Sequence, residues 1–227
     1  MRRRTLVTGA VTLAAGWSGG AAAEAGGPVV LELFTSQGCS SCPPADALLG
    51  ELSRETGVIA LAWHVDYWNN LGWHDPFASR AFTERQRAYA RLLGEEVYTP
   101  ALVVNGARMV VGSDRASVRA AINASGRLPI AAAVARSGGT LTVEIGAFAG
   151  SASALVVAYD PIQVTAVGAG ENAGRRLRDQ RVARALWSRP AQPGRFSLSG
   201  IDPAQGAVLL VQDDGGRIIG AADSAGA

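Results

Sequence analysis

The feature that most constrains how this chain of 227 residues can fold is its one pair of cysteines, Cys39 and Cys42, separated by two serines. The chain has no other cysteine, so a disulfide-rich scaffold is excluded. The apolar run at 29–34 predicts a buried strand before the pair, and Pro43 and Pro44 fit the first turn of a helix after it. The pair is therefore expected in a turn between a strand and a helix.

This position favours redox chemistry, because the free N–H groups of a helix N-terminus stabilise a thiolate. We expect Cys39 to be the exposed nucleophile and Cys42, one turn inside the helix, to resolve the mixed disulfide. A purely structural disulfide is an alternative role for the pair. Half of a zinc site is another, but His64 and His74 lie too far apart for the usual ligand spacing. Haem attachment is excluded because Pro43 stands where the histidine is required.

Composition excludes several other kinds of chemistry. All 21 basic residues are arginines, so neither a Schiff-base lysine nor a P-loop lysine exists. Only two histidines are present, which excludes a three-histidine metal site. With 48% hydrophobic and 18% charged residues, the chain does not belong to the disordered class. We predict no cofactor and no metal.

Residues 1–25 have the layout of an export signal peptide. A basic start precedes a mostly apolar stretch, and Ala23-Glu24-Ala25 fits a cleavage site. Arg3-Arg4 resembles the pair of a twin-arginine signal. Cleavage after Ala25 removes three arginines and one glutamate and takes the formal charge from +2 to zero. The mature protein is expected to be periplasmic or secreted, with no membrane span and no nucleic-acid partner.

Residues 26–127 are expected to form an α/β domain with the element order β-α-β-α-β-β-α. Helices are predicted over 43–56 and 76–93, each followed by a glycine, and Ser113 or Asp114 can cap a third helix. The predicted strands are 29–34, 58–65, 101–104 and 108–111.

Residues 128–227 have a different sequence pattern. Short apolar runs alternate there with turn signals such as Ser137-Gly138-Gly139, Asp160-Pro161 and Asp214-Gly215-Gly216. This pattern predicts an antiparallel, all-β, sandwich-like domain. It contains no cysteine and no histidine, so its expected role is support or partner selection.

The residues around the cysteine pair resemble a known family. The run from Glu32 to Asp46, the run from Trp63 to Trp68, and Thr99-Pro100 are similar to exported bacterial proteins of unknown function built on a thioredoxin-like core. Gly170 to Arg175 extends the resemblance into the second half. The resemblance implies a thioredoxin-like fold for about residues 29–125 and a redox role for the pair.

The resemblance also implies roles for residues far from the cysteines in sequence. Thioredoxin-like domains carry a cis-proline beside the dithiol, which assigns Thr99 and Pro100 to the site. His64 and Asp66, at the end of the second strand, are expected near Cys39. There His64 either stabilises a thiolate or relays a proton, or it is a structural histidine.

Glu32 stands one residue from the place of the buried acid of thioredoxins. We expect it to transfer a proton to Cys42, or else to be an outward-facing strand carboxylate. The aromatic residues Trp63, Tyr67 and Trp68 are expected either to form a surface for a polypeptide partner or to be core and lid.

These observations predict an exported thiol–disulfide oxidoreductase that acts on protein or small-molecule disulfides. The alternative is a non-catalytic binding module that handles copper or another soft metal through Cys39, Cys42 and His64. A third interpretation is a partner-binding protein with a dormant disulfide. The arginine-rich stretch that follows Glu171-Asn172 is interpreted as a solvated strand-and-loop face, with an anion or partner site as the alternative. Nucleic acid is set aside, because no aromatic residues are interleaved with the arginines.

Overall fold

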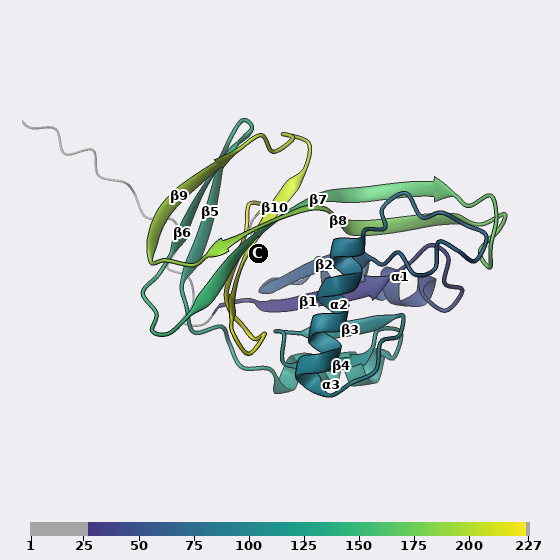
Figure 1. Ribbon diagram of the computed structural model, residues 1–227, viewed down its shortest axis with the longest axis horizontal. Helices are drawn as coiled ribbons and strands as arrows, with labels where there is room; N and C mark the ends of the chain where they lie inside the picture. The colour runs from purple at the N-terminus through teal and green to yellow at the C-terminus, as the bar shows by residue number, and fades with distance from the viewer. Residues whose placement is uncertain (1–26, 226–227) are drawn as a thin grey trace, which may run out of the picture.

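The computed structural model describes residues 27–225, so the predicted export signal at 1–25 lies outside the described residues (Figure 1). The elements are, in chain order, β1 (Val29–Thr35), α1 (Pro43–Leu52), β2 (Val58–His64), α2 (Arg80–Leu93), β3 (Ala101–Val104), β4 (Arg108–Val111), α3 (Arg115–Ala124), β5 (Ala132–Ser137), β6 (Thr140–Ile145), β7 (Ala152–Ala166), β8 (Arg176–Pro190), β9 (Gly194–Ser199), β10 (Gly206–Asp213) and β11 (Ile218–Asp223). No helix within this range is long and apolar enough to cross a membrane.

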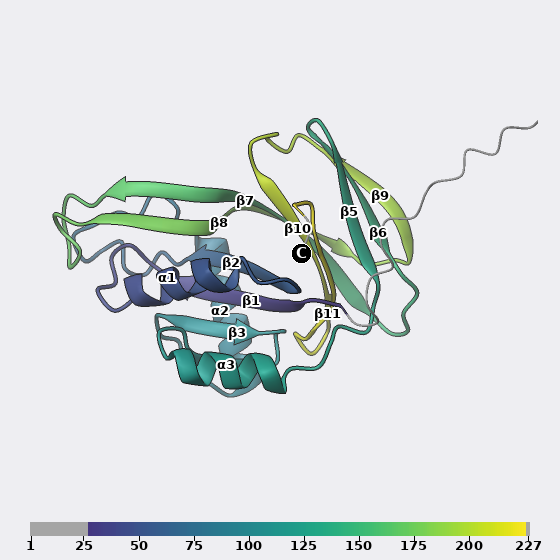
Figure 2. The same cartoon turned by 180° about the vertical axis from the view of Figure 1, so that it is seen from behind.

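One mixed, eight-stranded sheet runs through both halves of the chain, in the order β11-β10-β7-β8-β2-β1-β3-β4. The long strands β7 and β8 pair antiparallel along their length. The halves join where β8 pairs in parallel with β2, at Ala62 and Val182. Figures 1 and 2 view the molecule from opposite sides, and both show the β7–β8 hairpin lying alongside β2 and β1.

The expected fold class, a thioredoxin-like α/β domain followed by a separate sandwich-like β domain, is wrong. The molecule is mostly β, and strands from both sides of residue 128 belong to the same sheet. The physical reason is a shared core, because Phe34 and Trp63 pack in one buried cluster with Val157 and Leu210. A second sheet, in the order β5-β6-β9, covers the other face of β7 and β10.

Alternation along β1 divides its side chains between two layers. Leu31 and Leu33 pack with α1 and α3 on one face of the sheet. Val30 and Phe34 pack with α2 and the second-half strands on the other. Because successive residues of a strand point to opposite faces, Thr35 continues the α1 face and Glu32 belongs to the α2 face.

Candidate functional site

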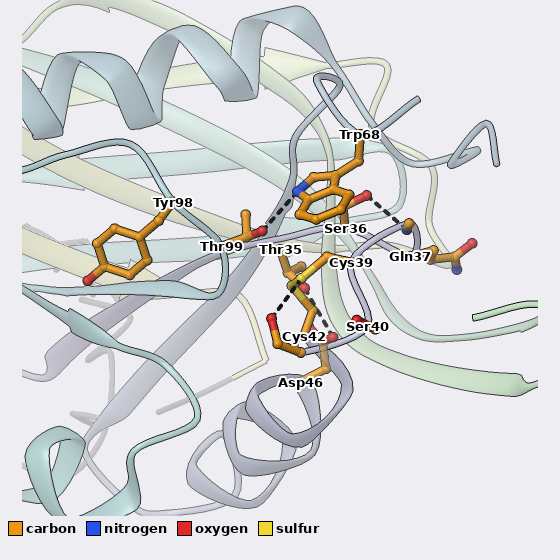
Figure 3. The surroundings of a disulfide bond; sticks show 12 residues. Thr35, Ser36, Gln37, Cys39, Ser40, Cys42, Asp46, Trp68, Tyr98 and Thr99 are labelled. Carbon is orange, nitrogen blue, oxygen red and sulfur yellow. Dashed lines mark hydrogen bonds between the residues drawn. A yellow bond between two sulfur atoms is a disulfide. The ribbon is translucent and has the colours of Figure 1, made fainter. Parts of the chain in front are cut away.

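The site is built around a disulfide between Cys39 and Cys42, whose Cα atoms are 5.5 Å apart (Figure 3). Cys39 lies in the loop after β1, and Cys42 is the N-cap residue of α1. The prediction that Cys42 lies one turn inside the helix is therefore wrong. Both cysteines are 0% exposed, so the expected exposure of Cys39 is also wrong for the disulfide form.

A tight turn brings the cysteines together. The Cys42 N–H donates to the carbonyl of Cys39 at 3.3 Å, and the Cys39 N–H donates to the carbonyl of Ser36 at 3.1 Å. The two spacer serines are exposed, and the Ser41 Oγ lies 3.3 Å from the Cys39 Sγ. The spacer therefore places a hydroxyl group beside the first sulfur.

Trp68 and Thr99 lie on the opposite side of the disulfide from α1 (Figure 3). The Trp68 Nε1–H donates to the Thr99 Oγ1 at 2.9 Å. The Thr99–Pro100 peptide bond is cis, which confirms that expectation. Loop and indole pack so closely that a Cβ placed on Gly38 would lie 3.1 Å from the Trp68 Cβ. A larger residue before the first cysteine would therefore require Trp68 to shift by a few tenths of an ångström.

Asp46 lies beside the disulfide on its α1 side, one helical turn after Cys42 (Figure 3). Its carboxyl group is buried. The Oδ2 accepts a hydrogen bond from the Thr35 Oγ1 at 3.0 Å, and the Oδ1 has no protein partner. Burial, assisted by the nearby Asp179 carboxyl, raises the pKa of Asp46 to about 7. At neutral pH this group can therefore both accept and donate a proton.

His64 lies in the same buried layer, with its Nδ1 2.7 Å from the Asp75 Oδ2. Burial opposes a charge on the ring, but the Asp75 carboxylate outweighs it and, with Asp179 and Asp46, raises the pKa of His64 to about 9. The protonated ring in turn holds the pKa of Asp75 below its usual value against the effect of burial. His64 is thus a buried cation among three carboxyl groups.

The second half of the chain contributes directly to the cysteine loop. Asn172 lies in the loop that connects β7 to β8, and its side chain is buried. Its Nδ2 donates to the carbonyls of Gln37 and Cys39, both at 2.9 Å. The Ser40 N–H donates to the Glu171 Oε2 at 3.0 Å. The Gln37 Nε2 donates to the Asp179 Oδ2, on β8, at 2.7 Å.

Glu32 does not lie behind Cys42 as expected. It points to the α2 face of the sheet, where both of its oxygens bind the Arg85 guanidinium, at 2.6 and 2.9 Å. The Tyr89 hydroxyl also donates to it. Glu32 is therefore part of a buried ion pair on the far side of the sheet from α1, and the outward-facing alternative is wrong as well.

Three further predicted residues contact α2. The Asp66 Oδ1 accepts a hydrogen bond from Thr83 in α2 at 2.6 Å. Trp63 is fully buried and packs edge-on against Phe82, so it is a core residue. Tyr67 donates from its hydroxyl to Gln86 of α2. Among the predicted partner-surface residues, Trp68 binds Thr99 beside the disulfide, and the Tyr67 hydroxyl also interacts with the Thr99 side chain.

The soft-metal alternative gains no support from the geometry. Among residues 27–225, no group of three or more His, Cys, Asp or Glu side chains is placed to hold a metal ion. Two surface cavities, of about 320 and 400 Å³, are lined by residues such as Met109 and Tyr89 and do not include the cysteines.

Asp46 and Asn172 are among the site residues that sequence reasoning missed. Asp46 carried a readable signal, because it follows Cys42 by four residues and so lies on the same helical face. Asn172 lies within the stretch from Gly170 to Arg175 that carried the resemblance, but only the fold shows that its amide reaches Cys39.

The fold and the site define a mixed-sheet protein with a buried CxxC disulfide at the N-terminus of a helix. The chain belongs to DUF1223, a family of proteins of unknown function, whose sequence profile matches residues 30–212.

Two solved structures are similar to the chain. An X-ray structure of an Agrobacterium tumefaciens protein is 30% identical, with a TM-score of 0.75, and the match covers 88% of this chain and 95% of the other. HBP35 of Porphyromonas gingivalis is 14% identical, with a TM-score of 0.60 over 87% of this chain and 74% of the other. The second likeness concerns the fold alone. No curated protein matches the chain.

Proposed function

We propose that this protein is an exported thiol–disulfide oxidoreductase whose dithiol, Cys39 and Cys42, exchanges with protein or small-molecule disulfides. The observation that carries the proposal is the buried Asp46 carboxyl, with a pKa near 7, one turn below the cysteine pair. Groups whose pKa lies near the working pH are suited to moving protons during catalysis. The assignment to an exported compartment rests on the layout of residues 1–25.

In the first step, the Cys39 thiolate attacks one sulfur of a substrate disulfide. An S–S bond forms between Cys39 and that sulfur, and the other substrate sulfur leaves as a thiolate that takes up a proton. The Ser41 hydroxyl, 3.3 Å from the Cys39 Sγ, can donate a hydrogen bond to the attacking thiolate.

In the second step, the Cys42 thiol transfers its proton to Asp46 and attacks the Cys39 sulfur. The Cys39–Cys42 disulfide forms and the second substrate thiol is released. The protein loses two electrons and the substrate disulfide gains two. The same steps in reverse oxidise a substrate dithiol. The positive charge of His64 favours the Asp46 carboxylate that must accept the proton.

Turnover of a disulfide-bonded peptide in the presence of dithiothreitol tests this proposal. Cys39→Ser and Cys42→Ser should abolish turnover above the uncatalysed rate. Asp46→Asn should slow it by about 100-fold at pH 7, a typical effect of losing a proton-transfer group. Asp66→Asn is the matched control, because its carboxyl group binds Thr83 rather than the cysteine loop, and it should leave turnover unchanged. Equal rates for the wild type and Cys39→Ser would refute the proposal.

One observation favours a second candidate function. Both cysteines are fully buried, as expected for a permanent disulfide within a partner-binding protein. Such a disulfide would show no turnover, and Cys39→Ser and Cys42→Ser would change only the free energy of unfolding. Because the closed loop is so short, that change should lie at or below the usual range of about 2–4 kcal/mol.

A further inference from the structure

Two side chains of the second half bind the turn that holds the cysteines: Glu171 accepts from the Ser40 N–H, and Asn172 donates to the Cys39 carbonyl. Asn172 is fully buried, and its Nδ2 donates to the carbonyls of Gln37 and Cys39. The Arg175 Nη1 donates to the Asn172 Oδ1 at 2.8 Å, which keeps the NH₂ group of the amide turned toward the cysteine loop. Arg175 thereby orients the amide without touching the turn.

The carbonyl that Asn172 binds is also part of the cysteine turn itself. The Cys39 oxygen accepts a second hydrogen bond from the Cys42 N–H, and this bond closes the four-residue turn from Cys39 to Cys42. By fixing the orientation of the carbonyl, Asn172 holds the turn in the geometry that places the two sulfurs within bonding distance.

The hairpin that carries Asn172 does not need this side chain for its own turn. Backbone hydrogen bonds close it, from the Val167 N–H to the Arg175 carbonyl and from the Gly174 N–H to the Val167 carbonyl. Gly170 and Gly174 supply the positive φ angles of the loop. The Nδ2 of Asn172 is therefore not needed for this turn and binds the cysteine loop instead.

We propose that Asn172 is a positioning residue that acts through the Cys39 carbonyl and sets the equilibrium between dithiol and disulfide. The biological meaning of this inference rests on the proposed function. A turn held in the disulfide geometry raises the effective concentration of one thiol at the other. In exchange with glutathione disulfide, the protein dithiol becomes a disulfide while two glutathione thiols form. Loss of Asn172 therefore favours the dithiol form.

The test is the equilibrium constant of the full mature chain with glutathione, measured by quenching and alkylating the free thiols. Asn172→Ala should shift this constant toward the dithiol by about tenfold, the effect expected for loss of one or two hydrogen bonds. Arg175→Ala should shift it in the same direction by less. Arg175 is exposed, so this second variant should fold even if Asn172→Ala does not.

Asn105→Asp is the matched control. Asn105 is a buried amide that also binds backbone groups, since its Nδ2 donates to the Gly126 carbonyl at 3.1 Å and its Oδ1 accepts from the Val30 N–H. Asn105 follows β3 and binds the N-terminal end of β1, whereas the cysteine loop follows the C-terminal end of β1. Asn105→Asp should therefore lower the melting temperature and leave the glutathione equilibrium unchanged.

A purely structural role for Asn172 would destabilise the dithiol and disulfide forms equally. The inference is overturned if Asn172→Ala or Arg175→Ala lowers the melting temperature in both forms while the equilibrium constant stays at the wild-type value. The constant is measured without catalysis, so a wild-type protein that equilibrates but does not turn over refutes only the proposed function.

Discussion

Asp46 carries a buried carboxyl group whose pKa, about 7, lies above the ordinary value of 3.8 for an unfolded chain. The folded protein therefore binds this proton more tightly than the unfolded chain does, and the contribution of Asp46 to stability falls as the pH rises from about 4 to about 7. Asp46→Asn removes this loss. Relative to the wild type, the variant should gain stability between pH 4 and pH 8, by at most about 4 kcal/mol.

The measurement is the free energy of urea unfolding of the disulfide form at several pH values. Asp114→Asn is the control of opposite sign, because hydrogen bonds from Ser117 and Ala116 lower the pKa of Asp114. That variant should lose stability relative to the wild type as the pH rises. An Asp46→Asn difference that does not change with pH would show that Asp46 titrates as an ordinary carboxyl group.

At the residue scale, the sequence predicted the site residues that belong to a short, recognisable motif. The cysteines and the cis bond of Thr99–Pro100 could be predicted, because spacing and the resemblance point to them. Glu32 could not be placed, since a shift of one residue along β1 moves a side chain to the opposite face of the sheet. Asn172 lies 133 residues from Cys39, and no local pattern reports that contact.

At the scale of elements, the loop between β2 and α2 covers the disulfide through Trp68. Removal of the indole in Trp68→Ala should open a path to the buried sulfurs. We therefore expect the disulfide to be reduced several-fold faster by a small phosphine, measured as free thiol against time. Trp187→Ala is the control, because this exposed tryptophan on β8 is not part of the site. Equal rates for the three proteins would show that Trp68 does not limit access.

The strands of the second half were harder to interpret than the helices. Asp160-Pro161 was predicted to end a strand, yet β7 runs through it, because β10 pairs with β7 only as far as Tyr159. Beyond that point the edge of β7 is unpaired within the described residues, and the missing N–H of proline costs no sheet hydrogen bond. In contrast, Asp114 caps α3 as the sequence indicated.

At the scale of the whole molecule, the sheet makes the two halves interdependent. The run from Leu155 to Tyr159 is apolar without alternation, which is the signature of a strand buried on both faces. One face of β7 packs against the first half and the other against the second sheet. This apolar run could have predicted that β7 lies inside a shared sheet. The change of composition near residue 128 instead favoured the prediction of two separate domains.

Truncation tests this interdependence. A fragment of residues 26–127 loses the part of the core supplied by Val157, Tyr159 and Leu210, and it exposes Phe34 and Trp63. We expect it to show no cooperative thermal unfolding, measured by circular dichroism. The chain of residues 26–227 is the control. A fragment with a sharp transition and the wild-type glutathione equilibrium would show that the second half is dispensable for both fold and site.

The central claim, that Cys39 and Cys42 form an exchanging dithiol, is tested most directly by trapping. Reduced Cys42→Ser is incubated with glutathione disulfide, and the adduct is located by mass spectrometry of its peptides. A stable mixed disulfide at Cys39 is predicted, whereas the reduced wild type should release two glutathione thiols and return to its internal disulfide. If native Cys42→Ser forms no adduct while the same protein forms one in denaturant, the claim is contradicted.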